Sequence, residues 1–169
     1  MSIIDMLRHL VAGCRAFNHR YQTVNHLLEG RNMSRHSTIE ECCDDIGWSI
    51  DERNGDTIGL YFNDKKFGPH RLKVSNCDGQ VHTLYTLCNA AIPARKMPSE
   101  LLAWLLVRNG EIAFGKWQMH VDDDDDCIFV LSYTAFGSAF NGATFKHVCE
   151  KMIEEAHDLD AQLQKKGLL

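Results

Sequence analysis

The sequence predicts an α+β fold in which a largely antiparallel sheet packs against helices on one face. The dipeptides Asn54-Gly55 and Asp78-Gly79 are each flanked by alternating apolar residues, which is typical of a hairpin between antiparallel strands. Long apolar stripes at helical spacing lie near both ends of the chain. Because the expected strand pairs have hairpin-length links, they need no parallel crossover.

Length and composition are those of a folded protein. The chain has 169 residues, of which 44% are hydrophobic and 24% charged, and it contains only 3 prolines. A chain of this size can form a core without disulfides or metals. We expect two parts, a heptad-patterned helix over residues 1–31 and an α+β domain over residues 35–169.

The first part is predicted from a seam of apolar residues spaced alternately four and three apart, which is typical of a coiled coil. The seam predicts a helix of about 27 residues, roughly 40 Å long at 1.5 Å per residue, that ends at Gly30. This helix can pack within its own chain, or it can bind a second copy or a partner helix. The residues predicted to make that interaction are Ile3, Leu7, Leu10, Phe17, Tyr21, Val24 and Leu28, with Cys14 in the same seam.

The second part is expected to start with a short helix and four strands. Ser37 and Glu40 have the spacing of a capping box, so a helix should begin there and end at Gly47. Residues 48–50 and 58–62 alternate in polarity around the first turn dipeptide, and residues 72–74 and 81–87 do so around the second. The sequence therefore predicts two successive hairpins.

A helix, two strands and a final helix should follow. Residues 99–108 are apolar nearly all round and are followed by Asn109-Gly110, so we expect the central buried helix to end at this cap. Residues 112–121 alternate only if Gly115 is a bulge, and the return strand covers residues 127–134. The last amphipathic helix starts near Phe145 and ends near Gly167.

Charge and hydropathy argue against nucleic-acid and membrane partners. The net charge is −5, and no run of Lys or Arg is longer than two. No apolar run reaches the ~18 residues that span a bilayer, and Asp5, Arg8 and His9 interrupt any signal-peptide core. We therefore expect a cytoplasmic protein. Residues 1–33 carry four basic and two acidic side chains, and the remainder carries fourteen and twenty-one.

The candidate metal ligands lack the spacing that metal sites need. The acidic run 122–126 has neither the alternating oxygens nor the distant Glu of a calcium loop, so we interpret it as a solvated hairpin tip. Cys42-Cys43 are vicinal and have no second cluster to complete a zinc site. We expect no metal, and we expect reduced thiols in the core, among them Cys14, Cys88, Cys127 and Cys149.

No catalytic or cofactor motif stands out. The chain lacks the nucleophile-elbow, phosphate-loop, dinucleotide-binding and helical zinc-protease patterns, so we expect no enzyme and no cofactor. The alternative is a small-ligand binder or an enzyme whose site gathers His70, Arg71, His82 and Cys88 on one hairpin. The loop 136–142 is either a binding lip or, as we prefer, a connection whose aromatic side chains fill the core.

Residues 97–163 resemble the YbjN-like and type III secretion chaperone-like families. In these families a helix ending in Asn leads to a Phe-Gly strand start, a hairpin and a helix with an Ala-Asp-like pair. The matching segments here are Met97-Pro98-Ser99-Glu100-Leu101-Leu102, Arg108-Asn109, Ala113-Phe114-Gly115-Lys116-Trp117 and Glu155-Ala156-His157-Asp158-Leu159.

The resemblance implies a compact α+β domain, commonly a homodimer, that binds an extended or amphipathic segment of another protein. It therefore implies a non-enzymatic, chaperone-like or regulatory adaptor of a bacterial cytoplasm, and the YbjN-like group is associated with sensory transduction. The motifs are structural, so they transfer no functional residue. This chain departs from the secretion chaperones by having four strands before the central helix where they have three, and by its additional N-terminal helix.

Overall fold

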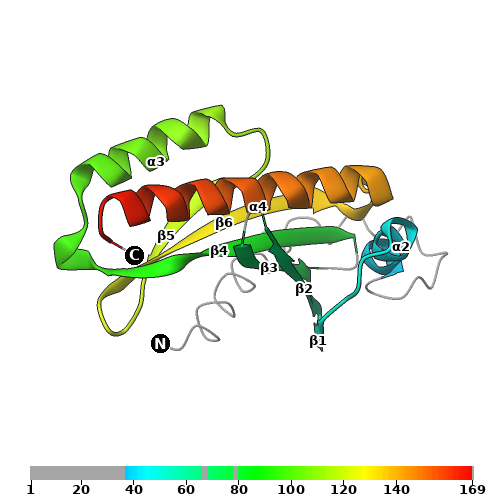
Figure 1. Ribbon diagram of the computed structural model, residues 1–169. Helices are drawn as coiled ribbons and strands as arrows, with labels where there is room; N and C mark the ends of the chain where they lie inside the picture. The colour runs from blue at the N-terminus through cyan, green and yellow to red at the C-terminus, as the bar shows by residue number, and fades with distance from the viewer. Residues whose placement is uncertain (1–36, 66–67, 78–79, 169) are drawn as a thin grey trace, which may run out of the picture.

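A computed structural model of the chain describes residues 37–65, 68–77 and 80–168 (Figure 1). The predicted helix over residues 1–31 and the turn dipeptide Asp78-Gly79 lie outside these ranges. In chain order the elements are α2 (Ser37–Ile46), β1 (Glu52–Asn54), β2 (Thr57–Asp64), β3 (Gly68–Asn76), β4 (Val81–Pro93), the 3-10 turn η2 (Ala94–Lys96), α3 (Ser99–Glu111), β5 (Lys116–Val121), β6 (Asp126–Phe136), the 3-10 turn η3 (Gly137–Ala139) and α4 (Gly142–Lys165).

The strands form one six-stranded sheet in the order β1-β2-β3-β4-β6-β5, and every neighbouring pair is antiparallel. Both predicted hairpins are present, with β1 and β2 joined around Gly55, and β3 and β4 paired around the second dipeptide. Strand β6 inserts between β4 and β5, so the last hairpin extends the sheet at its β4 edge. The predicted α+β, antiparallel fold class is confirmed.

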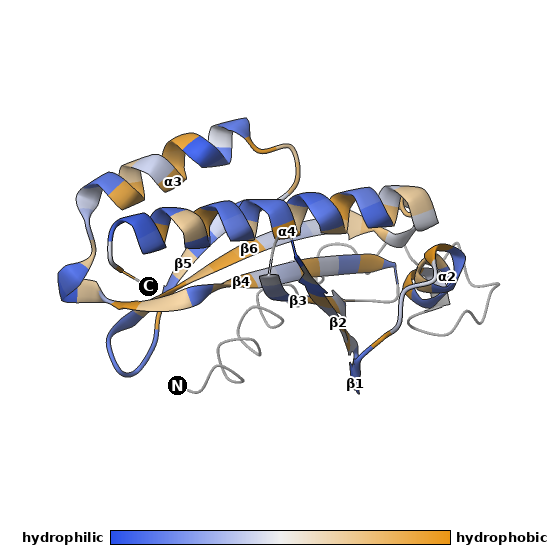
Figure 2. Cartoon of the chain, viewed as in Figure 1, coloured by the Kyte–Doolittle hydropathy of each residue, from blue (hydrophilic) through white to orange (hydrophobic). Residues whose placement is uncertain are grey.

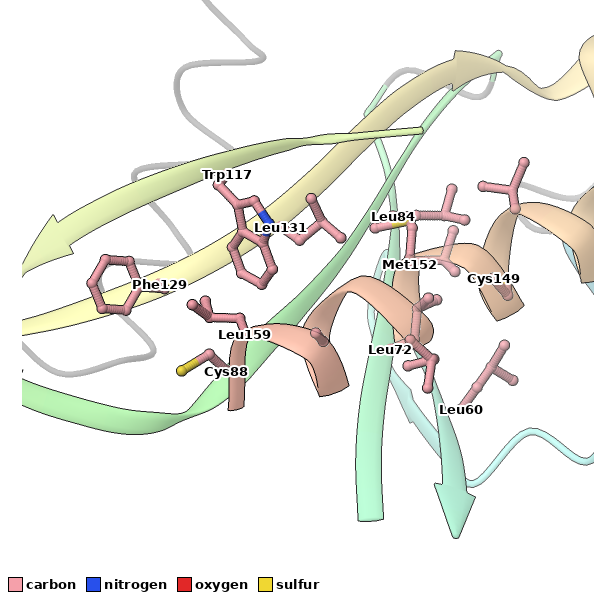
Figure 3. Packing of buried hydrophobic residues seen from close by; sticks show 14 of the residues in the cluster. Leu60, Leu72, Leu84, Cys88, Trp117, Phe129, Leu131, Cys149, Met152 and Leu159 are labelled. Carbon is pink, nitrogen blue, oxygen red and sulfur yellow. The ribbon is translucent and has the colours of Figure 1, made fainter. Parts of the chain in front are cut away.

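Helix α4 is the central helix of the domain, and the prediction that helix 99–108 would be the buried one was wrong. Nine residues of α4 are buried, among them Phe145, Met152 and Leu159, which are fully covered. Figure 3 shows Met152 beside Leu84 of β4 and Leu159 close to Trp117 of β5. In contrast, only Leu101 and Leu105 of α3 are buried. An all-round apolar pattern does not distinguish a buried helix from one that exposes an apolar face.

The residues at the two ends of α4 explain where the helix begins and ends. The Asn141 side chain accepts a hydrogen bond from the backbone N–H of Thr144, and the Thr144 hydroxyl accepts one from the N–H of Asn141. This reciprocal pair satisfies two backbone donors at the helix start. Gly167 has φ +66° just after the helix, a conformation that glycine adopts at little cost. The predicted end near Gly167 is confirmed.

Helix α2 lies at one end of the sheet and packs on the first turn of α4 (Figure 1). The helix begins at Ser37, as predicted, and its last residue precedes Gly47, which has φ +70°. A Cβ atom on Gly142 would lie 2.9 Å from side-chain carbons of Asp45 and Ile46, so the two helices approach too closely for a side chain there. An ion pair between Glu40 of α2 and Arg53 of β1 links the helix to the sheet.

Helix α3 continues to Glu111, so the prediction that Asn109-Gly110 ends it was wrong. The Asn109 side chain donates to the carbonyl of Trp117 at 3.0 Å and accepts from its N–H at 2.6 Å. This amide therefore bonds to the backbone of strand β5 instead of capping its own helix. The helix ends where Ile112 becomes extended and inserts into the core.

Two predicted strand segments are extended connections. Trp48 and Ile50 precede β1 and pack against the main core. The apolar and polar residues alternate there because every second side chain is turned to the core, although the segment is not a strand of the sheet. Residues 112–115 precede β5, and Gly115 has φ +87° before the strand begins instead of forming a bulge within it. Its missing Cβ would lie 2.9 Å from Leu131 Cδ1, which explains why glycine is needed there.

We predict that Leu159→Ala lowers the free energy of unfolding by about 2–5 kcal/mol, because it leaves a cavity between α4 and the sheet. Gln164→Ala on the exposed side of the same helix should change it by less than about 0.5 kcal/mol. Urea unfolding followed by circular dichroism measures both. Equal effects of the two substitutions would contradict the central role of α4.

Candidate interaction surfaces

The predicted hairpin site around His70, Arg71, His82 and Cys88 does not assemble. His70 and Arg71 are neighbours on β3 and point to opposite faces of the sheet, His70 buried towards α4 and Arg71 exposed. The His70 ring lies 6.2 Å from that of His157 on α4. His82 pairs with Asn76, six residues further along β3 than His70, which is about 20 Å at 3.3 Å per residue. The four side chains therefore do not gather in one site, although Arg71 and Cys88 both line a groove of about 410 Å³.

The core thiols are buried and protonated at neutral pH. Burial raises the pKa of Cys88 to about 12 and that of Cys43 to about 11, and it raises the pKa of Cys149 well above its usual range. A thiol is nucleophilic and binds metal only as the thiolate. In the described residues no group of three or more His, Cys, Asp or Glu side chains is placed to hold a metal. The prediction that Cys88, Cys127 and Cys149 lie in the core is confirmed.

The acidic run 122–126 forms the tip of the β5–β6 hairpin, as predicted. The Asp122 carboxylate accepts hydrogen bonds from the backbone N–H groups of Asp124 and Asp126, both at 3.0 Å. Asp125 has φ +63°, which completes the tight turn. The Asp122 side chain therefore organises its own loop, a structural role that Asp commonly has in turns.

The loop after β6 contains one buried and one exposed phenylalanine. Phe140 is buried and stacks edge-to-face on Phe145, with ring centroids 5.7 Å apart. Phe136 is 61% exposed at the end of β6. The interpretation that aromatic side chains of this loop fill the core therefore holds for Phe140 and was wrong for Phe136.

The sheet has a second face, opposite α4, with a small apolar cluster of its own. We call it the second-face cluster, and it consists of Tyr85 and Leu87 of β4 and Ile128 and Val130 of β6. These residues alternate with Leu84, Phe129 and Leu131, which face α4, and Leu87 is the cross-strand partner of Val130. The cluster is separate from the main core, because the sheet itself lies between the two.

The same face is polar over β1 to β3. Arg71 and Lys73 lie there beside Tyr61, and the Arg71 guanidinium carbon is 6.0 Å from the centre of the Tyr61 ring. These three residues line two grooves of about 500 and 410 Å³. The Lys73 ammonium is 3.6 Å from a carboxylate oxygen of Glu52. The face therefore changes from polar to apolar between β3 and β6.

A second exposed apolar surface lies on α3 and β5, which contact each other. Leu106 and Val107 of α3 are 73% and 63% exposed, and Met119 and Val121 of β5 are also exposed. In Figure 1, α3 lies apart from α4 at the periphery of the described part of the chain. We call these four residues the α3–β5 surface. Isolated exposed apolar residues are ordinary, but grouped ones typically mark an interaction site.

Helix α3 is held in place by polar contacts at its C-terminal end. The Arg108 guanidinium donates to both carboxylate oxygens of Glu155 on α4, from Nε at 2.9 Å and from an Nη at 2.6 Å. This bidentate bond is stronger than a single neutral hydrogen bond, and it raises the pKa of Arg108. The α3–β5 surface is therefore presented by a helix whose end is fixed to the central helix.

Sequence reasoning missed the α3–β5 surface. It placed helix 99–108 in the core, and the same apolar pattern is also typical of a surface helix with a binding face. It missed the second-face cluster too, although residues 127–131 are apolar without interruption. Such a run indicates a strand that is covered on both faces.

None of the helices in the described part of the chain has the length and apolar character that spanning a bilayer requires. No protein-family model matches the sequence, and a comparison with curated proteins gives no match either.

Solved structures do share the fold. The chain is similar to YbjN from E. coli, described as a candidate transcription regulator, with a TM-score of 0.57 and 16% identity over 78% of this chain and 93% of that one. It is also similar to the Yersinia pestis type III secretion chaperone SycH, solved with a fragment of YscM2, with a TM-score of 0.51 and 16% identity over 75% and 99%.

The chaperone–effector complex of SchA and HopA1 is a third similar structure, with a TM-score of 0.54 and 13% identity over 78% of this chain and 99% of the matched one. At these identities the similarity establishes a shared fold and no shared activity. The resemblance to the YbjN-like and type III secretion chaperone-like folds is thus confirmed, and it extends well beyond residues 97–163.

We predict that iodoacetamide at pH 8 labels Cys43, Cys88 and Cys149 at least about tenfold more slowly than the half-buried Cys77, because their thiols stay protonated and covered. Peptide mass spectrometry gives the rate at each cysteine, and labelling in concentrated urea serves as the control. A labelling rate at Cys88 equal to that at Cys77 would show a reactive thiol and reopen the enzyme alternative.

Proposed function

We propose that this protein is a non-enzymatic protein-binding domain, a chaperone-like or regulatory adaptor that acts as a homodimer in a bacterial cytoplasm. The fold supports the proposal, because two of the similar structures described above are chaperones that were solved with a protein partner. The observation that carries it is the α3–β5 surface, which exposes four large apolar side chains on elements that the domain holds rigidly. A rigid apolar surface binds with little loss of conformational entropy.

The dimer contact is proposed on α3. Leu106 and Val107 lie on its exposed side together with Ala103 and Gly110, whose small size lets a second helix approach closely. Two copies related by a two-fold axis would place the same side chains against each other, as an isologous interface requires. The dimer would bury Leu106 and Val107 of both copies, and burial of these four side chains would offset part of the free-energy cost of association.

The partner segment is proposed to bind at the edge strand β5. Met119 and Val121 are exposed there, and β5 is the last strand in the order of the sheet. An extended segment can add to a sheet edge through backbone hydrogen bonds, while apolar pockets select its side chains. The partner is therefore another protein that offers an extended apolar segment. Neither nucleic acid nor a cofactor is part of the proposal.

Several features argue against the alternative of an enzyme or small-ligand binder. Of the four residues proposed for that site, His70 and Arg71 point to opposite faces of the sheet, and His82 lies about 20 Å from His70 along the hairpin. The thiol among them, Cys88, is held protonated by burial. The groove of about 500 Å³ is lined mostly by charged and polar residues, whereas the pockets that bind small ligands are mostly apolar.

We predict that the wild-type chain is a dimer in multi-angle light scattering at micromolar concentration. Leu106→Asp should weaken the dimer at least about tenfold, because it places a carboxylate in an apolar contact. Ala143→Asp is the matched control, since this exposed position lies in the first turn of α4, where a carboxylate is favourable. A monomeric wild type, or a Leu106→Asp dimer of unchanged affinity, would contradict the dimer.

We predict that partner binding depends on β5. In capture experiments from the native host, the double substitution Met119→Asp and Val121→Asp should remove a protein that the wild type and Ala143→Asp both retain. Quantitative mass spectrometry compares the three. If the double variant retains every protein that the wild type does, the partner does not bind at β5. Circular dichroism of the variant checks that the domain is still folded.

A further inference from the structure

The second face of the sheet is covered over β4 and β6, although none of the described helices lies on it. Val130 is fully buried, and Ile128 and Tyr85 are 7% and 8% exposed. Helix α4 contacts β3 and β4 from the other side, where its buried side chains meet Leu72 and Leu84, and α2 packs on α4. Among the described residues, only Leu87 adds a partly buried apolar side chain to this cluster. A face left open to water would expose Val130.

The pattern of burial along the strands locates this cover. Strand β6 is buried at every position from Cys127 to Leu131, whereas β2 and β3 alternate at their centres between the core and the exposed side chains of Tyr61 and Arg71. His120 of β5 pairs with Ile128 and lies on the same face, and burial lowers its pKa. The cover therefore lies over β4, β6 and β5 and leaves β1 to β3 open.

We propose that the cover is this chain's own N-terminal segment, whose apolar stripe over residues 3–28 docks on the second-face cluster. An apolar residue recurs every three or four positions along the stripe, so these side chains would share one face of a helix. Such an apolar face can pack on the apolar second-face cluster. The proposal assigns the stripe to a contact within one chain. It is independent of the dimer and partner sites proposed on α3 and β5.

The dimensions of the two surfaces agree. A helix over residues 3–28 would be about 40 Å long. Strands β4 and β6 have 13 and 11 residues, or about 43 and 36 Å at 3.3 Å per residue. One helix along these strands would therefore cover the whole cluster, and its width of about 10 Å spans two strand spacings.

Chain connectivity favours the same chain over a second copy. Helix α2 begins at Ser37 and lies at the end of the sheet (Figure 1), so the N-terminal segment is attached at that end. Residues 32–36 can span about 17 Å, enough to pass round that end. A tether this short gives a millimolar effective concentration, which a second molecule would not match at ordinary protein concentrations.

Charge supports the contact without determining its register. Residues 1–33 carry four basic and two acidic side chains, while the rest of the chain carries fourteen and twenty-one. The acidic tip 122–126 lies at the end of the β5–β6 hairpin, of which His120, Ile128 and Val130 lie on the second face. Opposite net charges attract over a longer range than apolar contacts act, so a mildly basic helix would be drawn to the acidic domain before it docks.

Photo-crosslinking in the full chain tests the proposal. Replacing Phe17 of the stripe with p-benzoylphenylalanine should give, on irradiation, crosslinks to peptides that contain residues 85–87 or 128–130, in a product of monomer mass. The same probe at His19, on the polar side of the predicted helix, is the matched control and should crosslink at least about fivefold less. A second probe at Leu10 guards against a local misfit at Phe17.

Mixing isotopically light and heavy chains before irradiation separates the two possible sources of the segment. If the contact is within one chain, the two peptides of every crosslinked pair are both light or both heavy. Mixed products would overturn the proposal in favour of a second copy. Crosslinks to α2, α3 or α4, or none from either stripe position, would overturn it as well. The crosslinking result does not depend on the proposed dimer contact on α3. That contact is tested separately, by the effect of Leu106→Asp on the dimer.

Discussion

The contact between α4 and the sheet is the constraint on which the rest of the structure depends. One helix covers β3 and β4 with a continuous buried stripe, contacts α2 at its first turn and bonds to Arg108 of α3 near its middle. Figure 2 shows that the outward side of α4 is mostly hydrophilic, while β4 and β6 are hydrophobic along much of their length. With α4 in this place, α3 is left on the outside of the molecule. Leu101 and Leu105 of α3 still reach the core, but Leu106 and Val107 on its other side face solvent.

The same arrangement accounts for the two surfaces that carry the proposals. Strand β6 lies between β4 and β5, so its residues alternate between α4 and the opposite face, and both sets are apolar. The second face therefore needs a cover over this half of the sheet, and the N-terminal stripe is proposed to provide it. The α3–β5 surface lies elsewhere on the molecule and is free for another protein. The two proposals thus use different elements: β4 and β6 bind the chain's own N-terminal segment, and α3 and β5 bind other molecules.

Much of the fold could be predicted because the signals are local. Asn54-Gly55 specifies its turn through backbone conformation, and the pattern from Phe145 to Leu163 specifies α4 through helical spacing. The errors arose where a residue bonds to a distant one. Asn109 reads as a helix cap, yet its amide bonds to the backbone at Trp117. Gly115 reads as a bulge, yet it precedes the strand with φ +87°, and Leu131 leaves no room for a side chain there.

The sequence by itself determined the element types, the antiparallel pairing and the absence of recognisable catalytic motifs, because each depends on a few neighbouring residues. Tertiary structure alone decided which of two apolar helices is central, which side chains of β3 share a face with α4, and that His70 and His82 lie about 20 Å apart. These outcomes depend on strand order and on competition between helices for one sheet face. Hydrophobic patterning shows that Leu106 and Leu159 are apolar, but only packing decides that Leu159 is buried and Leu106 is exposed.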